Sequence, residues 1–484
     1  MKNLKYIVIF FLLFTETSCD KNLELVNPND LSIAAIGQSE SDLTLLLNGC
    51  YDALQKNHAD AYRWLDNFSG ISFGDNNITD GASTPEEARY LLCWSRSYLL
   101  IGRCNELLSI IKGIQAPNTA IKTIESEALF LRSYAYYQLM VLFKDVPLVT
   151  SRQSFADRLV KKNTQAEIRT QITKDLDYVI QNLPINNRYP KVTKGAAMTL
   201  AAKVYANFSE WNKVSQLTND LISLKKYSLY PSYDNLFSEA AENNSEAILS
   251  VAYLSGLGEG EAFSGIFSGS PNQMDPPLSN YADAFYCTDG KPIGKSPLYN
   301  KTKFFENRDP RYEVNILRDG DIINKQPFAA KFSVTGYFLQ KYVRVNTTAY
   351  RDDGPVDFMI FRYADVLLLR AEALIESGQL TPEVYQLINQ VRSRVKMPKV
   401  EDVEGANLTQ AQLREIIRQE RLVELGLEGD IRWFDIKRWN IVEQVYNSIT
   451  FRKRPYRGEK TLFWPIPQTE IANNPNLVQH DWWK

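Results

Sequence analysis

The segment from Gln412 to Trp439 most constrains what this chain can fold into. From Leu413 to Leu427, leucine, isoleucine and valine recur at helical spacing, a pattern typical of a helix whose apolar face is buried. Gly426 and Gly429 are expected to loosen or end that helix. The sequence therefore predicts a core helix followed by a change of direction.

Charged residues are as prominent in this segment as apolar ones. Glu420 and Glu424 lie four residues apart, so their side chains share one face of the expected helix. After Gly429, charges alternate with large aromatic rings, and charges are buried in proteins only when they are paired. We therefore predict a structural ion-pair network, with a catalytic acid pair as the alternative. The expected members of the network are Glu420, Arg421, Glu424, Arg432, Asp435 and Arg438.

Length and charge narrow the class of protein. The 484 residues would allow roughly two to four domains, but no linker rich in proline, glycine or serine divides the chain, so we expect one body over residues 41–484. Lysine and arginine total 55 against 57 aspartates and glutamates, which argues against a nucleic-acid partner. Aromatic residues make up 12% of the chain and would suit stacking on sugar rings.

The N-terminus has the features of an export signal. A short basic start is followed by an apolar run from Tyr6 to Phe14, which is too short to span a bilayer. Small residues then precede Cys19, as in a bacterial lipoprotein signal whose cysteine becomes the acylated N-terminus. We predict a signal peptide over residues 1–18, lipidation at Cys19 and a tether over residues 19–40. An unlipidated signal peptide cut near Ser18 is the alternative.

The remaining cysteines do not suggest a disulfide framework. There are five cysteines in all, and Cys19 is the one that lipidation would remove from any pairing. Cys93 and Cys104 fall on one expected helix, roughly 16 Å apart by helical rise, which is beyond the reach of a disulfide. We expect these two, together with Cys50 and Cys287, to be buried as small apolar residues.

Most of the body is predicted to be helical. Helical spacing occurs in residues 41–55, 85–111, 121–143, 164–182, 193–209, 211–224, 362–377 and 381–395. Small residues on one helix face large ones on the next, the arrangement that tetratricopeptide-like pairs require. The predicted fold is therefore mostly α, with helical pairs in 41–226 and 358–440 stacked around one core.

Residues 227–357 differ in character from the helical parts. Proline, glycine and short apolar strings dominate there, and we expect a long loop-rich insert with short strands at 247–254 and 338–345. Residues 441–484 are expected to form an irregular C-terminal segment.

Three stretches carry a resemblance to a known family. Residues 420–439 read ERLVELGLEGDIRWFDIKRW, residues 127–148 read EALFLRSYAYYQLMVLFKDVPL, and residues 307–311 read NRDPR. These motifs resemble those of the SusD/RagB family of outer-membrane nutrient-binding lipoproteins. In the last motif, Asp-Pro would preset a turn from which the flanking arginines reach acids on neighbouring segments.

The resemblance implies a function that composition does not. It implies a lipid-anchored protein at the cell surface that captures an oligosaccharide and passes it to a SusC-like TonB-dependent transporter. Peptides are the alternative ligand, as in some RagB-like relatives. Two other classes of protein are the alternatives, a surface glycoside hydrolase and a periplasmic helical-repeat scaffold.

Catalytic signatures are sparse. The chain has two histidines, His58 and His480, neither in a metal-ligand spacing, and we expect no metal site, no cofactor and no nucleic acid. A hydrolase would need two carboxylates that face each other in space, which a sequence does not show. The loop acids to test for that role are Asp75, Asp80, Asp283 and Asp289.

Two loops combine aromatic rings with amide or carboxylate groups and are our candidates for the ligand site. Their candidate residues are Phe73, Asp75, Asn76, Asn77, Phe263, Phe267, Asn272 and Gln273. The rings would stack on sugars and the polar groups would bond to hydroxyls. Burial in the core is the alternative for the rings, and simple turn formation is the alternative for the asparagines.

Overall fold

The structure is a computed structural model. It describes residues 39–58, 65–74, 77–263, 276–317, 319–323, 326–327, 329, 331, 333–343 and 353–484. None of the helices in these ranges is long and apolar enough to cross a membrane.

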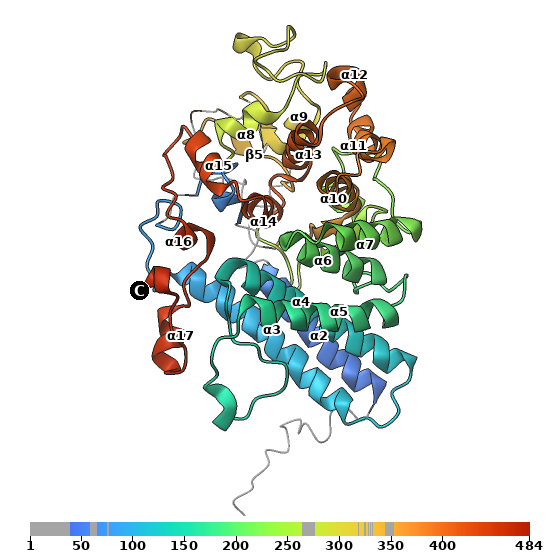
Figure 1. Ribbon diagram of the computed structural model, residues 1–484, viewed down its shortest axis with the longest axis vertical. Helices are drawn as coiled ribbons and strands as arrows, with labels where there is room; N and C mark the ends of the chain where they lie inside the picture. The colour runs from blue at the N-terminus through green and yellow to red at the C-terminus, as the bar shows by residue number, and fades with distance from the viewer. Residues whose placement is uncertain are drawn as a thin grey trace, which may run out of the picture.

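Helices pack against one another in sequence along one side of the molecule (Figure 1). They are α2 (Glu40–Asn57), α3 (Ala88–Lys112), α4 (Thr119–Phe143), α5 (Gln165–Asn182), α6 (Lys194–Asn207) and α7 (Trp211–Ser223). The stack continues with a segment distant in sequence, because α10 (Tyr363–Glu376) packs on α7. The predicted mostly helical fold is confirmed.

The second helical part surrounds the segment that opened the sequence analysis. Helix α10 contacts both α11 (Pro382–Arg394) and α13 (Gln410–Leu425). Helix α12 (Val400–Glu404) joins the two, and α14 (Ile431–Arg438) follows. Gly426 ends α13, and a β-carbon there would lie 2.6 Å from the hydroxyl of Tyr281, so only glycine allows this approach.

Side-chain caps fix where several helices begin. Ser39, Thr164 and Thr409 each accept a hydrogen bond from the backbone three residues later, in complete capping boxes before α2, α5 and α13. Helix α3 begins later than expected, at Ala88, because Thr84 accepts a hydrogen bond from the N–H of Glu87 and closes a turn instead.

Lys144 ends α4 with a backbone φ of 67°, a conformation that normally favours glycine. Its ammonium lies 3.1 Å from Glu459 and 4.9 Å from the centroids of both the Phe463 and Trp482 rings. These contacts with the C-terminal segment help to stabilise a lysine at this position.

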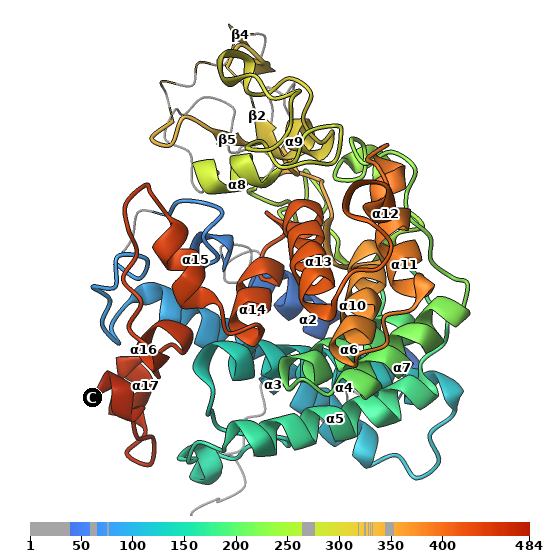
Figure 2. The same ribbon diagram turned by 45° about the horizontal axis from the view of Figure 1, so that its top comes forward.

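The loop-rich insert contains short elements. They are β1 (Ala247–Val251), α8 (Ser279–Ala284), α9 (Arg311–Asn315), β2 (Ile316–Leu317), β3 (Ile322–Ile323), β4 (Gln326–Pro327) and β5 (Phe338–Leu339). Strand β2 pairs with β5 and β3 pairs with β4, both antiparallel. Figure 2 shows α8, α9 and these small strands on the side of the molecule opposite α3, α4 and α5.

One strand was not predicted. β6 (Phe358–Arg362) pairs antiparallel with β1, at a position that we expected to belong to the helical part 358–440. Its five residues are all buried. A continuous apolar run shows no period of two, so periodicity does not separate such a strand from the start of the following helix.

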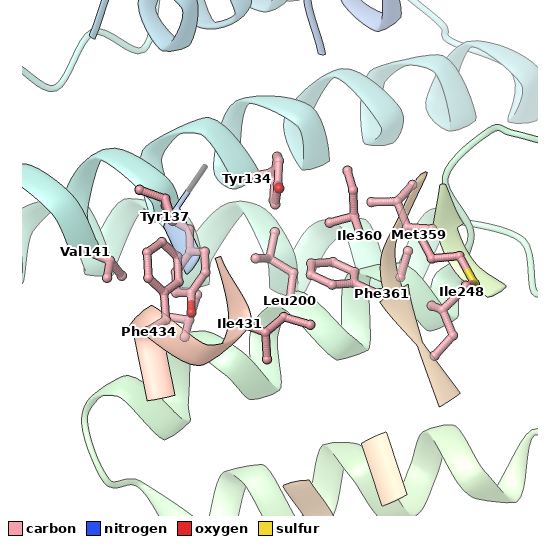
Figure 3. Close-up of a cluster of buried hydrophobic side chains, with 14 of the residues drawn as sticks. Tyr134, Tyr137, Val141, Leu200, Ile248, Met359, Ile360, Phe361, Ile431 and Phe434 are labelled. Atoms are coloured by element: carbon pink, nitrogen blue, oxygen red, sulfur yellow. The ribbon is translucent and has the colours of Figure 1, made fainter. Parts of the chain in front are cut away.

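The core joins this sheet to the helical stack. Figure 3 shows Ile248 of β1 and Phe361 of β6 near Tyr134 of α4 and Leu200 of α6. The Tyr134 and Phe361 rings meet edge to face with centroids 6.0 Å apart. The main apolar cluster draws residues from both ends of the described chain, Leu43 to Trp483.

The C-terminal segment is more regular than expected. It contains α15 (Val442–Ser448), α16 (Glu459–Leu462) and α17 (Gln468–Asn473). Short 3-10 turns also occur within the described residues, at Leu65–Phe68, Ala156–Arg158, Glu239–Ala241, Lys301–Lys303 and Asp481–Trp483.

Candidate functional site

The stems of the two candidate ligand loops lie side by side. Ser72 forms an antiparallel bridge with Pro277, and the N–H of Phe73 donates to the carbonyl of Pro276 over 2.9 Å. The N–H of Leu278 donates back to the carbonyl of Ile71 over 2.8 Å. Segments about 200 residues apart in the sequence are therefore held together by backbone hydrogen bonds.

A second pair of backbone hydrogen bonds lies between the residues next to the second loop and Gly354. Glu261 and Gly354 exchange both of their N–H···O hydrogen bonds, at 2.8 and 2.7 Å. We call residues 71–73, 261, 276–278 and 354 the loop framework. It holds in place the described residues that flank both candidate loops.

The two described candidate rings point into the core. Phe73 is 7% exposed and meets Phe451 edge to face at 5.2 Å, while the guanidinium of Arg452 lies 5.0 Å from its centroid. A ring buried to this extent is not available at the surface for stacking.

Phe263 is also 7% exposed. Its ring packs edge to face against Tyr253, Tyr342 and Phe358, with centroids 5.7 to 5.9 Å apart. The structure therefore buries this ring in the core, which was the alternative to stacking on a ligand.

The polar candidates divide between described and undescribed residues. Asn77 is exposed, and its side-chain amide donates to Glu87 over 2.8 Å while its carbonyl accepts from the N–H of Ala82, which is a turn arrangement. The other candidates lie outside the described residues and stay predictions. They are Asp75, Asn76, Phe267, Asn272 and Gln273.

The first of two buried ion-pair clusters is centred on Glu424 of α13. Its carboxylate lies 2.7 Å from Arg362 and 2.9 Å from Arg311, and it also pairs with Arg394. Burial alone would raise the pKa of Glu424, but these three guanidinium groups hold it well below its ordinary value.

The Glu424 cluster is balanced in charge. Five basic side chains, Arg311, Lys341, Arg362, Arg392 and Arg394, meet five acidic ones, Glu246, Asp309, Glu420, Glu424 and Glu428. These residues come from β6, α9, α11 and α13, and from the turns next to β1, β5, α9 and α13. The cluster therefore ties the insert to the helical body.

The second cluster lies on the other side of α13. Arg421 pairs with Asp365 at 2.9 Å and with Asp435 at 2.8 Å, and Arg438 pairs with Glu372 at 2.6 Å. Lys203 completes the set through Asp365 at 2.7 Å. Helix α13 therefore contributes Glu420 and Glu424 to one cluster and Arg421 to the other.

Arg432 departs from the predicted network. No carboxylate of the described residues lies within ion-pair distance of it, and its guanidinium lies 5.6 Å from the centroid of Trp439. Both oxygens of the nearby Asp435 are already taken by Arg421 and Arg438. Burial lowers the pKa of Arg432 to about 10. The prediction that Arg432 is a member of the ion-pair network is therefore wrong.

The two arginines of residues 307–311 also differ from each other. Arg311 pairs with Asp309 and Glu420, as expected for a residue that reaches acids. Arg308 instead donates to the backbone carbonyls of Ala282 and Phe285, where it closes the C-terminal end of α8.

Cysteines and histidines occupy structural positions. Cys50, Cys93, Cys104 and Cys287 are free and buried, as predicted, whereas Cys19 lies outside the described residues. The ring of His58 lies 4.3 Å from Phe358, and His480 stacks on Trp482 at 4.8 Å. Within the described ranges, no group of three or more side chains is arranged to hold a metal ion.

Two cavities in the described part of the chain lie away from the loop framework. One of about 420 Å³ is bounded by α11, α12, α13 and Tyr286. The other, of about 360 Å³, lies between β1 and the turn before α6, with Tyr189 and Tyr227 in its wall. Neither cavity is lined by residues of the loop framework.

Each half of the chain matches the model of a known protein family. Residues 245–483 match the model described as the SusD family. Residues 21–206 match a second model, described as starch-binding and associating with the outer membrane. The chain belongs to the SusD family. The resemblance inferred from the sequence motifs is therefore confirmed.

Individual SusD-like proteins are similar to this chain over nearly its whole length. A SusD-like protein of Formosa agariphila is 28% identical, and the match covers 99% of both chains. The crystal structure of a SusD-like carbohydrate binding protein from Bacteroides fragilis is 26% identical, with a TM-score of 0.81 over 91% of this chain and 99% of that one. A laminarin binding SusD-like protein has the same fold, with a TM-score of 0.73 and 22% identity over 91% and 99% of the two chains.

Sequence reasoning about this SusD-family protein missed most partners in the two clusters. Arg362, Asp365 and Glu372 lie in the apolar run 358–375, and isolated charges inside such a run are a signal for buried pairing. Lys341 and Glu246 lie in the insert, where the sequence carries no comparable signal.

Proposed function

We propose that this protein is a lipoprotein of the outer membrane, anchored through Cys19, that captures an oligosaccharide at the cell surface. It passes the ligand to a SusC-like TonB-dependent transporter. It acts by binding and not by catalysis.

The proposal rests on the family match and on what the similar proteins are described as binding. The model matched by residues 21–206 is described as starch-binding and associating with the outer membrane, and the 26%-identical structure is that of a carbohydrate binding protein. The loop framework supports a binding site because it joins two loops that carry rings, amides and carboxylates in their sequences.

The arrangement of the molecule is compatible with two separate functional faces. Figure 1 and Figure 2 both place helices α3 to α5 opposite α8 and α9. A helical-pair face offers a regular surface to a partner protein while loops on the other side bind ligand. We propose that the transporter docks on the helical side.

The alternative of a surface glycoside hydrolase rests on the loop acids. Asp289 accepts hydrogen bonds from the Ser296 hydroxyl at 2.9 Å and from the N–H of Lys291 at 3.1 Å, which is a turn-stabilising role. Asp80 and Asp283 are exposed, and Asp75 lies outside the described residues. No observation favours catalysis by these residues over binding.

A soluble Cys19→Ser form tests the ligand class. It is screened against an array of oligosaccharides, with laminarin and starch fragments included, and against a peptide mixture. We expect one glycan class to bind, to be confirmed by calorimetry, and to be recovered uncleaved. Cleavage of the bound glycan would favour the hydrolase, and binding of peptides alone would favour a RagB-like role.

The transporter is tested separately, with the lipidated protein in its own membrane. We expect a TonB-dependent transporter to co-purify with it after mild detergent extraction. Purification of the protein without any such transporter, under conditions that preserve other membrane complexes, would contradict the proposed partner.

A further inference from the structure

The cavity of about 420 Å³ has the size of a small-molecule site. It opens between α11, α12 and α13 on one side and Tyr286 on the other. Figures 1 and 2 show these three helices next to one another in both views. Ligand sites commonly enclose about 300–1,000 Å³, so the space is sufficient for a ligand of modest size.

Part of the cavity wall is apolar. Met397 and Val423 are 5% and 3% exposed, and Leu408 and Ile416 continue the same surface. Such a wall favours an aliphatic group over water, because apolar surface is removed from solvent on binding.

Arg392 forms a long ion pair with Glu420 in the same wall, but its guanidinium has a donor left over. Its side chain is buried, and its Nε has no hydrogen-bond partner. The nearest acid, Glu420, lies 3.6 Å from Nε, which is longer than a hydrogen bond. By contrast, Arg311 in the same cluster uses its Nε and both terminal nitrogens in hydrogen bonds to carboxylates.

A buried guanidinium with free donors is suited to a carboxylate. Its planar N–H groups match the two oxygens of a carboxylate, and leaving a buried donor without a partner costs free energy. A ligand carboxylate at Arg392 would supply the missing partner.

The rim of the cavity carries the opposite charge. Glu404 and Glu415 are exposed and both line the opening. Within the described residues, Glu404 makes no ion pair or hydrogen bond through its side chain, and Glu415 has one contact, to Arg418, at 3.5 Å. One guanidinium with an unbonded Nε–H and two weakly engaged carboxylates therefore line a single cavity.

We propose that this cavity binds a small zwitterion with an apolar body, the chemistry of an apolar amino acid. The carboxylate meets Arg392, the ammonium group meets Glu404 and Glu415, and the aliphatic part lies against Met397 and Ile416. The site is separate from the proposed oligosaccharide site, because it shares no residue with the loop framework.

Three probes of matched shape test the proposed chemistry by calorimetry on the soluble Cys19→Ser chain. L-Leucine carries both charges, 4-methylpentanoate lacks the ammonium group, and 3-methylbutan-1-amine lacks the carboxylate. We expect leucine to bind and each of the other two to bind at least about tenfold more weakly. Absence of leucine binding at millimolar concentration, or equal affinity for all three probes, would overturn the proposal.

Variants then locate the site. Ala411 lines the cavity from an exposed position on α13, so Ala411→Trp should fill the cavity and abolish leucine binding without lowering the melting temperature. Glu404→Gln should weaken leucine binding severalfold and leave 4-methylpentanoate no weaker. Asp402→Asn is the matched control, since Asp402 is exposed on the same short helix and does not line the cavity.

Each result bears on the proposal. Wild-type affinity of Ala411→Trp for leucine, or an equal loss of affinity in Asp402→Asn, would place any binding elsewhere and overturn it. Arg392→Gln should weaken leucine and 4-methylpentanoate but not the amine. A variant that weakens all three probes equally would contradict a carboxylate contact.

Discussion

Arg362 at the end of β6 lies 2.7 Å from Glu424 of α13, inside a cluster in which both side chains are almost fully buried. The pair joins the central two-stranded sheet to the helix that bears the family motif. Each residue also contacts further charges, since Arg362 pairs with Glu246 and Glu428. The motif glutamate is therefore a structural residue at the junction of insert and helical body.

The first prediction concerns this junction. Glu424→Gln removes one negative charge from among three arginines and leaves the buried cluster with one positive charge in excess, so it should lower the free energy of unfolding by about 3–5 kcal/mol. Urea denaturation followed by circular dichroism measures the change. Arg432→Gln serves as the comparison and should cost less, because Arg432 has no ion pair to lose. Equal losses of unfolding free energy in the two variants would contradict the conclusion that Glu424 is ion-paired and Arg432 is not.

The second prediction concerns pH. Burial lowers the pKa of Lys341 to about 8 from an ordinary 10.5, although Glu428 opposes the shift. Between these values the unfolded chain holds a proton that the folded chain has lost, so stability should rise with pH, by at most about 1.4 kcal/mol per unit. Below pH 8 both states are protonated and this contribution to the slope disappears.

The Lys341→Met variant isolates this contribution. The slope of unfolding free energy against pH, measured between pH 8 and 9.5, should be smaller in the variant than in the wild type. The buried tyrosines, such as Tyr342, stay protonated in the folded state over this range because burial raises their pKa values. Their ionisation in the unfolded chain is common to both proteins and cancels in the comparison. Identical slopes would show that Lys341 keeps its proton in the folded state.

The third prediction concerns anchoring. Cys19→Ala should release the exported protein from the membrane, because stable anchoring requires the acyl chains attached to that cysteine. Membrane fractionation measures the change, and Cys287→Ala, at a buried cysteine of the body, is the control. Retention of the Cys19→Ala protein in the membrane after export would contradict lipidation.

The fourth prediction concerns the ligand loops. Phe267→Ala should weaken binding of the oligosaccharide by about tenfold, near 1.4 kcal/mol, with no change in melting temperature. Phe73→Ala should instead lower the melting temperature, because Phe73 is a buried ring packed on Phe451. If Phe267→Ala binds the ligand as the wild type does, the site moves to the 281–295 segment.

Local patterns were sufficient to predict the long helices, but not the short ones of the insert and of the C-terminal segment. Thr164, Thr193 and Thr409 are caps whose side chains bond to the backbone three residues on, so short-range sequence marks where those helices begin. The family motifs also identified the family, since their order and spacing are specific. Strand β6 was missed because it lies in a continuous apolar run that continues directly into α10.

The sequence by itself determined the helical stack, the family and the need for paired charges in residues 412–439, because these follow from spacing and from the cost of burying a lone charge. Only the tertiary structure decided which charges pair. Glu424 takes its partners from β6, α9 and α11, whereas Arg432, on the same motif, finds its nearest acid already engaged. It also decided that Phe73 and Phe263 belong to the core and that Arg392 faces a cavity. Such outcomes depend on the packing of segments distant in sequence, and spacing along one chain carries no information about that packing.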